Sequence, residues 1–140
     1  MQHLIFKSLY YPFYLLTILI WVACSPGYMV VDRTGMTFFV DKVKLEMDLE
    51  VIDGEATRHL PIKQISRIVI DPTQTYFRND KLYYFSLVEL IDGTQIKPRE
   101  NGREITKSFV CIENNVWGKG TNGIIEMPLE NINIIQLNKK

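Results

Sequence analysis

Residues able to carry out catalysis or to hold a metal are sparse in this chain of 140 residues. Beyond the N-terminal segment it has a single histidine, His59, which excludes a multi-histidine metal site and leaves a Cys/His zinc cluster without ligands. No Gly-x-Ser-x-Gly turn is present to expose a serine nucleophile. The stretch from Gly118 to Thr121 is similar to part of a phosphate-binding loop. It does not match that motif, because Lys119 is followed by Gly120 rather than Ser or Thr. The sequence therefore predicts a protein that is not an enzyme and uses no cofactor.

The acidic residues are explained by turns. Asp71, Asp80 and Asp92 each stand beside Pro, Asn or Gly, where a carboxylate accepts hydrogen bonds from nearby backbone N–H groups. His59 is expected at a strand end or on the surface. One alternative stays open, a secreted glycan-binding protein or hydrolase whose acidic and aromatic site has no motif, because a pair of carboxylates brought together by the fold cannot be recognised in the sequence.

The start of the chain indicates where the protein works. A cation, Lys7, precedes an apolar run from Leu9 to Val22, and the run ends at Ala23, Cys24 and Ser25. A charged start, a short apolar run and small residues after it are typical of an export signal. The run is too short for a comfortable membrane span, which needs about 20 residues.

The end of this segment resembles the signal of bacterial lipoproteins, in which a small residue precedes a cysteine that is acylated and becomes the new N-terminus. The resemblance implies a signal peptide over 1–23, lipid attachment at Cys24 and an acylated linker over 24–28. It also implies a lipid-anchored location in the bacterial cell envelope, on the outer membrane or the periplasmic face. Trp21 departs from the aliphatic residue usual at its position, so an uncleaved membrane anchor and ordinary secretion remain alternatives.

Composition limits the remaining possibilities. Sixteen Lys and Arg balance sixteen Asp and Glu, so the whole chain carries no strong electrostatic footprint for nucleic acid or anionic lipid. The part after the signal is long enough for one domain or two very small ones. If Cys24 carries lipid, Cys111 has no disulfide partner, and its apolar neighbours predict a buried, inert thiol.

The rest of the chain is predicted to be all-β. Apolar and charged residues alternate without interruption from Val43 to Val51, as in a half-buried strand. Asp53-Gly54, Asp92-Gly93 and the segment 33–35 predict hairpin turns. Further strands are expected over 29–32, 36–40, 82–91, 105–113, 124–127 and 133–137, with loops over 97–103 and 114–123.

A repeat emerges when the chain is compared with itself at a shift of 67 positions. Residues 60–70 then align with 127–137 and keep an apolar residue, a proline and four aliphatic positions in the same places. The spacing predicts one turn of helix beginning at Pro61 or Pro128 and leading into a strand. The upstream segments 32–35 and 92–94 agree less well, at a different shift.

This pattern resembles a unit found in exported bacterial proteins of unknown function, similar in strand order to small SH3-like or Sm-like barrels. The resemblance implies two related antiparallel β-units within residues 29–140, about 29–70 and 82–137, built as half-barrels or as one β-sandwich or barrel after an N-terminal signal helix. It implies no inherited active site.

A concentration of aromatic residues suggests a contact surface. Between Tyr83 and Phe85 apolar residues fall on both faces of the expected strand, so the strand is either covered on both sides or uses its outer aromatics to bind. Trp117 is expected as a lid over a barrel end or as an exposed stacking residue. The candidate partner-binding residues are Tyr76, Phe77, Tyr83, Tyr84 and Trp117.

The function expected from these observations is that of a non-enzymatic, lipid-anchored interaction or assembly module. Its partners would be the membrane, through lipid at Cys24, and an unidentified envelope protein or glycan, and not nucleic acid. An inhibitor or immunity-type lipoprotein is physically indistinguishable from this reading at the level of sequence.

Overall fold

The computed structural model describes residues 27–53, 55–96, 99–100, 103–104 and 108–137. The expected signal peptide, Cys24 and Gly54 lie outside the described residues. The strands are β1 (Tyr28–Asp32), β2 (Thr37–Val40), β3 (Lys42–Leu45), β4 (Leu49–Asp53), β5 (Ala56–Leu60), β6 (Ile65–Arg78), β7 (Lys81–Leu90), β8 (Gln95–Ile96), β9 (Arg99–Glu100), β10 (Arg103–Glu104), β11 (Ser108–Cys111), β12 (Asn115–Gly120), β13 (Gly123–Pro128) and β14 (Ile132–Gln136). Two single turns of 3-10 helix, η1 (Ile62–Gln64) and η2 (Leu129–Asn131), precede β6 and β14. The all-β class is confirmed, and the described strands pair only in antiparallel fashion.

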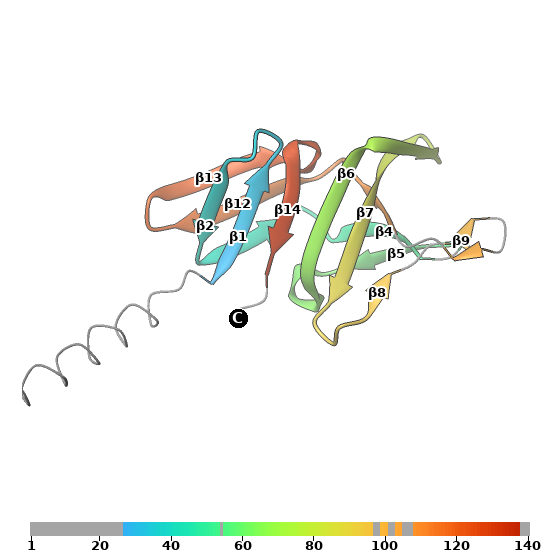
Figure 1. Cartoon of the computed structure of the whole chain (residues 1–140), viewed down its shortest axis with the longest axis horizontal. Helices are drawn as coiled ribbons and strands as arrows, with labels where there is room; N and C mark the ends of the chain where they lie inside the picture. The colour runs from blue at the N-terminus through green and yellow to red at the C-terminus, as the bar shows by residue number, and fades with distance from the viewer. Residues whose placement is uncertain (1–26, 54, 97–98, 101–102, 105–107, 138–140) are drawn as a thin grey trace, which may run out of the picture.

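The large sheet has the strand order β2-β1-β14-β6-β7-β11-β4-β5, with β8 beside β7, and a smaller sheet has the order β13-β12-β3. The strands fall into two groups, side by side in Figure 1. The first unit consists of β1, β2, β3, β12, β13 and β14. The second unit consists of β4, β5, β6, β7, β8 and β11. The first unit therefore combines strands from both ends of the sequence, and the second is built from the strands between them.

The two units have the same strand register. In β4 and β5, Leu49 pairs with Leu60 and Asp53 with Ala56. At a shift of 67 positions, Val116 pairs with Met127 and Gly120 with Gly123 in β12 and β13. The contacts between β11 and β4 correspond in the same way to those between β12 and β3. The shift of 67 positions found between residues 60–70 and 127–137 thus also relates β4 to β12, β5 to β13 and β3 to β11.

Strands β1 and β2 of the first unit correspond to β7 and β8 of the second at a shift of 58 positions, since Val30 pairs with Phe38 and Val88 with Ile96. Gly35 and Gly93 both adopt positive φ, at 86° and 85°. Each donates a hydrogen bond to the carbonyl three residues earlier, of Asp32 and Leu90 respectively. These are the turns expected at 33–35 and 92–93. The two shifts differ because the second unit has extra residues between β8 and β11, which include the paired strands β9 and β10.

A local two-fold axis relates the units. Where β6 and β14 meet, Ile68 pairs with its own counterpart Ile135, and Arg67 and Val69 pair with Gln136 and Ile134. Because Ile68 pairs with its equivalent in the other unit, and Arg67 and Val69 each pair with the equivalent of the other, a two-fold axis passes through the β6–β14 pair at Ile68 and Ile135. The connections from β3 to β4 and from β11 to β12 both run from one unit to the other, so the two halves of the chain exchange strands.

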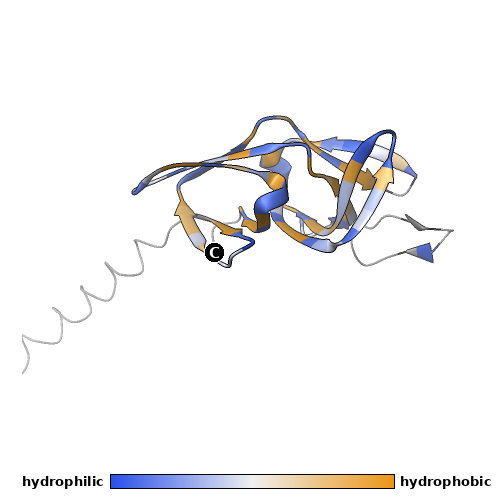
Figure 2. Cartoon of the chain, turned by 90° about the horizontal axis from the view of Figure 1, so that it is seen from above, coloured by the Kyte–Doolittle hydropathy of each residue, from blue (hydrophilic) through white to orange (hydrophobic). Residues whose placement is uncertain are grey.

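One main core runs through both units. Its fully buried members include the corresponding pairs Val30 and Val88, Ile65 and Ile132, and Ile68 and Ile135. Figure 2 shows apolar and polar residues mixed along the strands, as expected when one face of each strand is inside. A second, smaller cluster of Ile52, Tyr83, Phe109 and Cys111 lies on the outer side of the second unit.

The uninterrupted strand expected from Val43 to Val51 is wrong, although its alternation is real. The chain bends at Glu46, Met47 and Asp48, and β3 and β4 belong to different sheets. Asn114 stabilises the bend, since its Oδ1 accepts a 3.2 Å hydrogen bond from the N–H of Met47 and its Nδ2 donates a 3.0 Å bond to the carbonyl of Met47. The alternation could not reveal this partner, which is distant in the sequence.

The loop expectations need correction as well. Residues 115–120 form β12 instead of a connection, because β3 and β13 supply hydrogen-bonding neighbours on both sides. Within the loop expected over 97–103, the described residues contribute to β9 and β10. In the segment expected as a strand over 105–113, the described strand is β11, which ends at Cys111.

Candidate functional site

Charged and polar side chains converge on Glu50 of β4. The Oε2 atom of Glu50 lies 2.7 Å from Nζ of Lys81 and 3.5 Å from Nε2 of His59. Its Oε1 atom accepts a hydrogen bond from the hydroxyl of Tyr83. His59 is the direct partner of Glu50 across β4 and β5, whereas Lys81 and Tyr83 point to the same face because they are two residues apart on β7.

These contacts keep Glu50 anionic, Lys81 cationic and the Tyr83 hydroxyl neutral at neutral pH. Burial disfavours the Glu50 anion, but hydrogen bonds from Lys81 and Tyr83 outweigh it, so the pKa of Glu50 lies below its usual value. The hydrogen bond to Glu50 raises the pKa of Lys81. Burial, and then the hydrogen bond to Glu50, raises the pKa of Tyr83. Glu50 is thus an engaged anion and not a free general base.

The cluster borders a cavity of about 200 Å³. Its lining residues are Met47, Asp48, Glu50, His59, Lys81, Cys111, Glu113 and Asn114. Cys111 is a free, buried cysteine, as expected. Burial raises the pKa of the Cys111 thiol and outweighs a backbone hydrogen bond from Glu113 that lowers it, which disfavours the nucleophilic thiolate. The chemistry available here is the binding of a small polar or cationic group.

The described residues contain no group of three or more His, Cys, Asp or Glu side chains arranged to hold a metal ion. Nor do they include a helix long and apolar enough to cross a bilayer.

Asp71 and Asp92 accept hydrogen bonds from the N–H groups of Thr73 and Thr94, which is the turn role expected from the sequence.

The five predicted aromatic residues do not form one surface. Tyr83 is only 1% exposed and belongs to the second core cluster, so its assignment to a contact surface is wrong. Tyr84 packs against the main core and lies under the guanidinium of Arg33, 5.1 Å from ring centroid to Cζ. The strand from Tyr83 to Phe85 is therefore covered on both sides, the first of the two readings of its composition.

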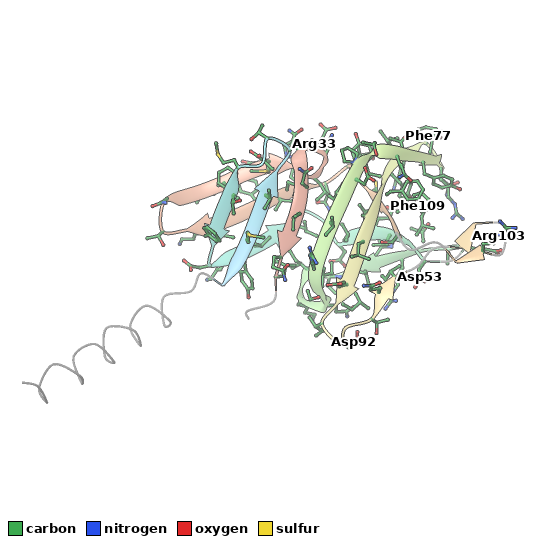
Figure 3. All side chains as sticks on the ribbon, viewed as in Figure 1. Arg33, Asp53, Phe77, Asp92, Arg103 and Phe109 are labelled. Atoms are coloured by element: carbon green, nitrogen blue, oxygen red, sulfur yellow. The ribbon has the colours of Figure 1, made fainter. Side chains whose placement is uncertain are left out.

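Tyr76 and Phe77 lie on a hairpin arm, defined as residues 75–84 of β6 and β7. Pro72, Thr73 and Gln74 have no partners across the hairpin, where the register shifts between Asp71 and Thr75. The arm places the ring of Tyr76 4.9 Å from that of Phe109 in β11. Phe77 is 67% exposed, and Figure 3 shows it on the arm above Phe109.

Trp117 lies in the middle of β12, on the first unit, and is 42% exposed. It is paired with Lys44 on one side and Glu126 on the other. It thus stands on the outer face of a sheet, which excludes the lid over a barrel end. The arm and Trp117 belong to different units and offer two separate places for contact.

Sequence reasoning missed Glu50, Lys81 and Cys111 as members of one cluster. Glu50 and Lys81 look like ordinary surface charges, and their proximity depends on β11 being inserted between β4 and β7. One signal in the sequence was the loss of alternation at 83–85, since one of its two readings was a strand covered on both sides.

Comparisons with family models, with curated proteins and with solved structures gave no match.

Proposed function

We propose that this protein is a lipid-anchored component of the bacterial cell envelope that binds a partner and does not catalyse a reaction. The proposal rests mainly on the position of Cys24, which lies at the end of the apolar run and just before the folded domain. Cys24 lies four residues before Tyr28, the first residue of β1. An extended chain of this length spans at most about 14 Å. Lipid at Cys24 would hold the domain close to the membrane surface.

The Glu50 cluster supports a binding function. A nucleophile with its base needs a group free to accept a proton, whereas Glu50 is already engaged by Lys81 and Tyr83. The Cys111 thiol is disfavoured as a thiolate. Such an arrangement positions charges for recognition. A hydrolase remains the second candidate because Glu50 and Glu113 line the same cavity.

The fold fits the same proposal. Each unit pairs its strands in antiparallel fashion and has a 3-10 turn before one of them, η2 before β14 in the first unit and η1 before β6 in the second, and we assign each unit to the small SH3-like or Sm-like barrels. The duplication of the two units within one chain belongs to this proposal and is supported by the shared registers and turns.

The hairpin arm is the proposed contact with an envelope protein or glycan. Phe77 exposes a large apolar ring on an element fixed at its tip, where the guanidinium of Arg78 donates a 2.8 Å hydrogen bond to the carbonyl of Glu55. A rigid exposed aromatic supplies contact area at low entropic cost.

Anchoring is tested by the mass of the protein extracted from membranes. The expected species begins at Cys24, and its mass exceeds that of residues 24–140 by at least the mass of a diacylglyceryl group. Cys24→Ala is expected to remain unprocessed and to lack the added mass. Wild-type processing of Cys24→Ala contradicts lipid attachment.

Partner binding is tested with Phe77→Ser, using cross-linking in intact envelopes to identify what lies against the arm. The matched control is Ile91→Ser, since Ile91 is 70% exposed and lies outside the arm. We expect Phe77→Ser to reduce the cross-linked species while Ile91→Ser retains it and both proteins keep wild-type stability. A hydrolytic activity abolished by Glu50→Gln would favour the second candidate.

A further inference from the structure

The outer face of the β13-β12-β3 sheet carries exposed lysines together with large apolar side chains. One row across the strands consists of Lys42, Lys119 and Ile124, and the next of Lys44, Trp117 and Glu126. All six residues are exposed, and Ile124 is 70% exposed. The balanced charge of the whole chain conceals this local arrangement.

The outermost row lies at the end of the first unit where the chain enters the domain. Tyr28, the first residue of β1, pairs with Val40, the last residue of β2. Only Asp41 separates Val40 from Lys42, and the N–H of Asp41 donates a 2.8 Å hydrogen bond to the carbonyl of Lys119. Registers alone therefore place Lys42 and Lys119 beside the start of β1.

Two further features lie at this end. Phe39, the neighbour of Val40, is 59% exposed. Strand β14 leaves the domain here, since Gln136 pairs with Met29, and the sequence continues to Lys139 and Lys140. In Figure 1 the start of β1 and the end of β14 lie together at the lower edge of this unit.

The corresponding face of the second unit is quite different. Lys42, Lys44 and Lys119 correspond there to Phe109, Cys111 and Ile52, all buried. The hairpin arm lies against that face through Tyr76 and Tyr83. No described element lies on the face of the first unit in this way, and its residues suit a boundary between water and an apolar phase.

We infer that this end of the first unit, made of Phe39, Lys42, Lys44, Trp117, Lys119 and Ile124, docks on an anionic bilayer surface. The inference rests on the proposed anchoring, because lipid at Cys24 would bring this end of the domain nearest the membrane. Tryptophan and aliphatic side chains enter the interfacial layer, and lysines meet anionic headgroups. The carboxylates of Asp41, Glu46 and Glu126 oppose this attraction, so the apolar side chains are needed as well as the lysines.

The experiment follows Trp117 in the mature protein extracted from membranes. The sequence has two tryptophans, Trp21 and Trp117, and Trp21 lies in the expected signal peptide, so Trp117 is the single tryptophan once residues 1–23 are removed. The protein is reconstituted into vesicles of phosphatidylcholine alone or mixed with phosphatidylglycerol, and quenching of Trp117 by brominated lipid and by aqueous acrylamide is compared. Flotation of the vesicles in high salt reports separately whether the chain is anchored.

We expect brominated lipid to quench Trp117 on vesicles that contain phosphatidylglycerol, and added salt to reverse the effect. Each lysine near an anionic surface favours the docked state about fivefold, so Lys42→Glu with Lys119→Glu is expected to lower the docking equilibrium constant by at least about 25-fold. The matched control is Lys63→Glu with Arg103→Glu, which makes the same charge change at exposed positions elsewhere.

Outcomes distinguish docking from anchoring. If the protein floats with the vesicles but acrylamide still quenches Trp117 fully, the docking inference is overturned and anchoring stands. The same result is expected if this face binds a protein. An equal loss of quenching in the control pair overturns the role of this face. Protein that does not float overturns both proposals.

Discussion

At the scale of single residues, Glu50 has the most consequential surroundings. Its carboxylate satisfies the hydroxyl of Tyr83, a side chain that is otherwise inside an apolar cluster with Ile52 and Phe109. A buried hydroxyl without a partner costs about 1–3 kcal/mol. Glu50 therefore contributes to stability through Tyr83 as well as through its ion pair with Lys81.

Glu50→Ala is expected to lower the free energy of unfolding by about 1–3 kcal/mol at neutral pH, because the hydroxyl of Tyr83 loses its acceptor. Tyr83→Phe removes the unsatisfied hydroxyl, so the double variant should be less destabilised than the sum of the two single variants. Chemical denaturation of all four proteins gives this coupling. Strict additivity would contradict a direct interaction.

The same residue predicts a dependence of stability on pH. The pKa of Glu50 is lower in the folded state than in the unfolded chain. Its contribution is therefore fully present above its unfolded pKa, about 4.3, and is lost as the pH falls through the folded value. The stability difference between wild type and Glu50→Gln should shrink on acidification below about pH 4. A difference that grows instead would reverse the assigned sign.

At the scale of elements, the two 3-10 turns are the most similar parts of the two units. Pro61 and Pro128 have φ of −65° and −60°, and the residues that end the turns, Ile65 and Ile132, have φ of −102° and −111°. Each of these isoleucines donates its N–H to the first carbonyl of its turn and is fully or almost fully buried. The turn delivers an aliphatic side chain into the core at the start of a strand.

Ile65→Ala and Ile132→Ala are each expected to cost about 2–5 kcal/mol, because both remove buried aliphatic groups from the same core. The exposed neighbours Lys63 and Glu130 should tolerate alanine within about 0.5 kcal/mol. Thermal and chemical unfolding of the four variants measures this. If only one isoleucine proved costly, the two turns would not have equivalent roles.

At the scale of the whole molecule, strand exchange is the defining feature. The first unit takes β1, β2 and β3 from the N-terminal part and β12, β13 and β14 from the C-terminal part, and the second unit is built in the complementary way. The main core includes Leu49 and Val116, which follow the two crossing connections. Neither half of the sequence contains all the strands of a unit.

Cutting the chain between Asn79 and Asp80, at the tip of the arm, tests this arrangement. Residues 27–79 and 80–140 expressed separately are each expected to lack cooperative unfolding as monomers, and to fold when combined, because each supplies half of both units. Circular dichroism and sedimentation report the result. A single fragment that folds alone as a monomer would contradict the strand exchange.

Local sequence determined much of this structure. Alternation predicted which faces of 43–45 and 49–51 are inside, glycines at positive φ marked the turns at Gly35 and Gly93, and the proline and aliphatic spacing of 60–70 and 127–137 predicted the two 3-10 turns. These features depend on backbone conformation and on periodicity, which neighbouring residues determine.

Tertiary structure decided the rest. The bend at 46–48 depends on Asn114, the burial of Tyr83 depends on the neighbouring strand β11 and on Glu50, and the lysine rows of the first unit depend on β12 lying between β3 and β13. Each of these contacts joins residues far apart in the chain. The sequence contains both partners but not their pairing, because strand order is determined by the packing of the whole core and not by any local pattern.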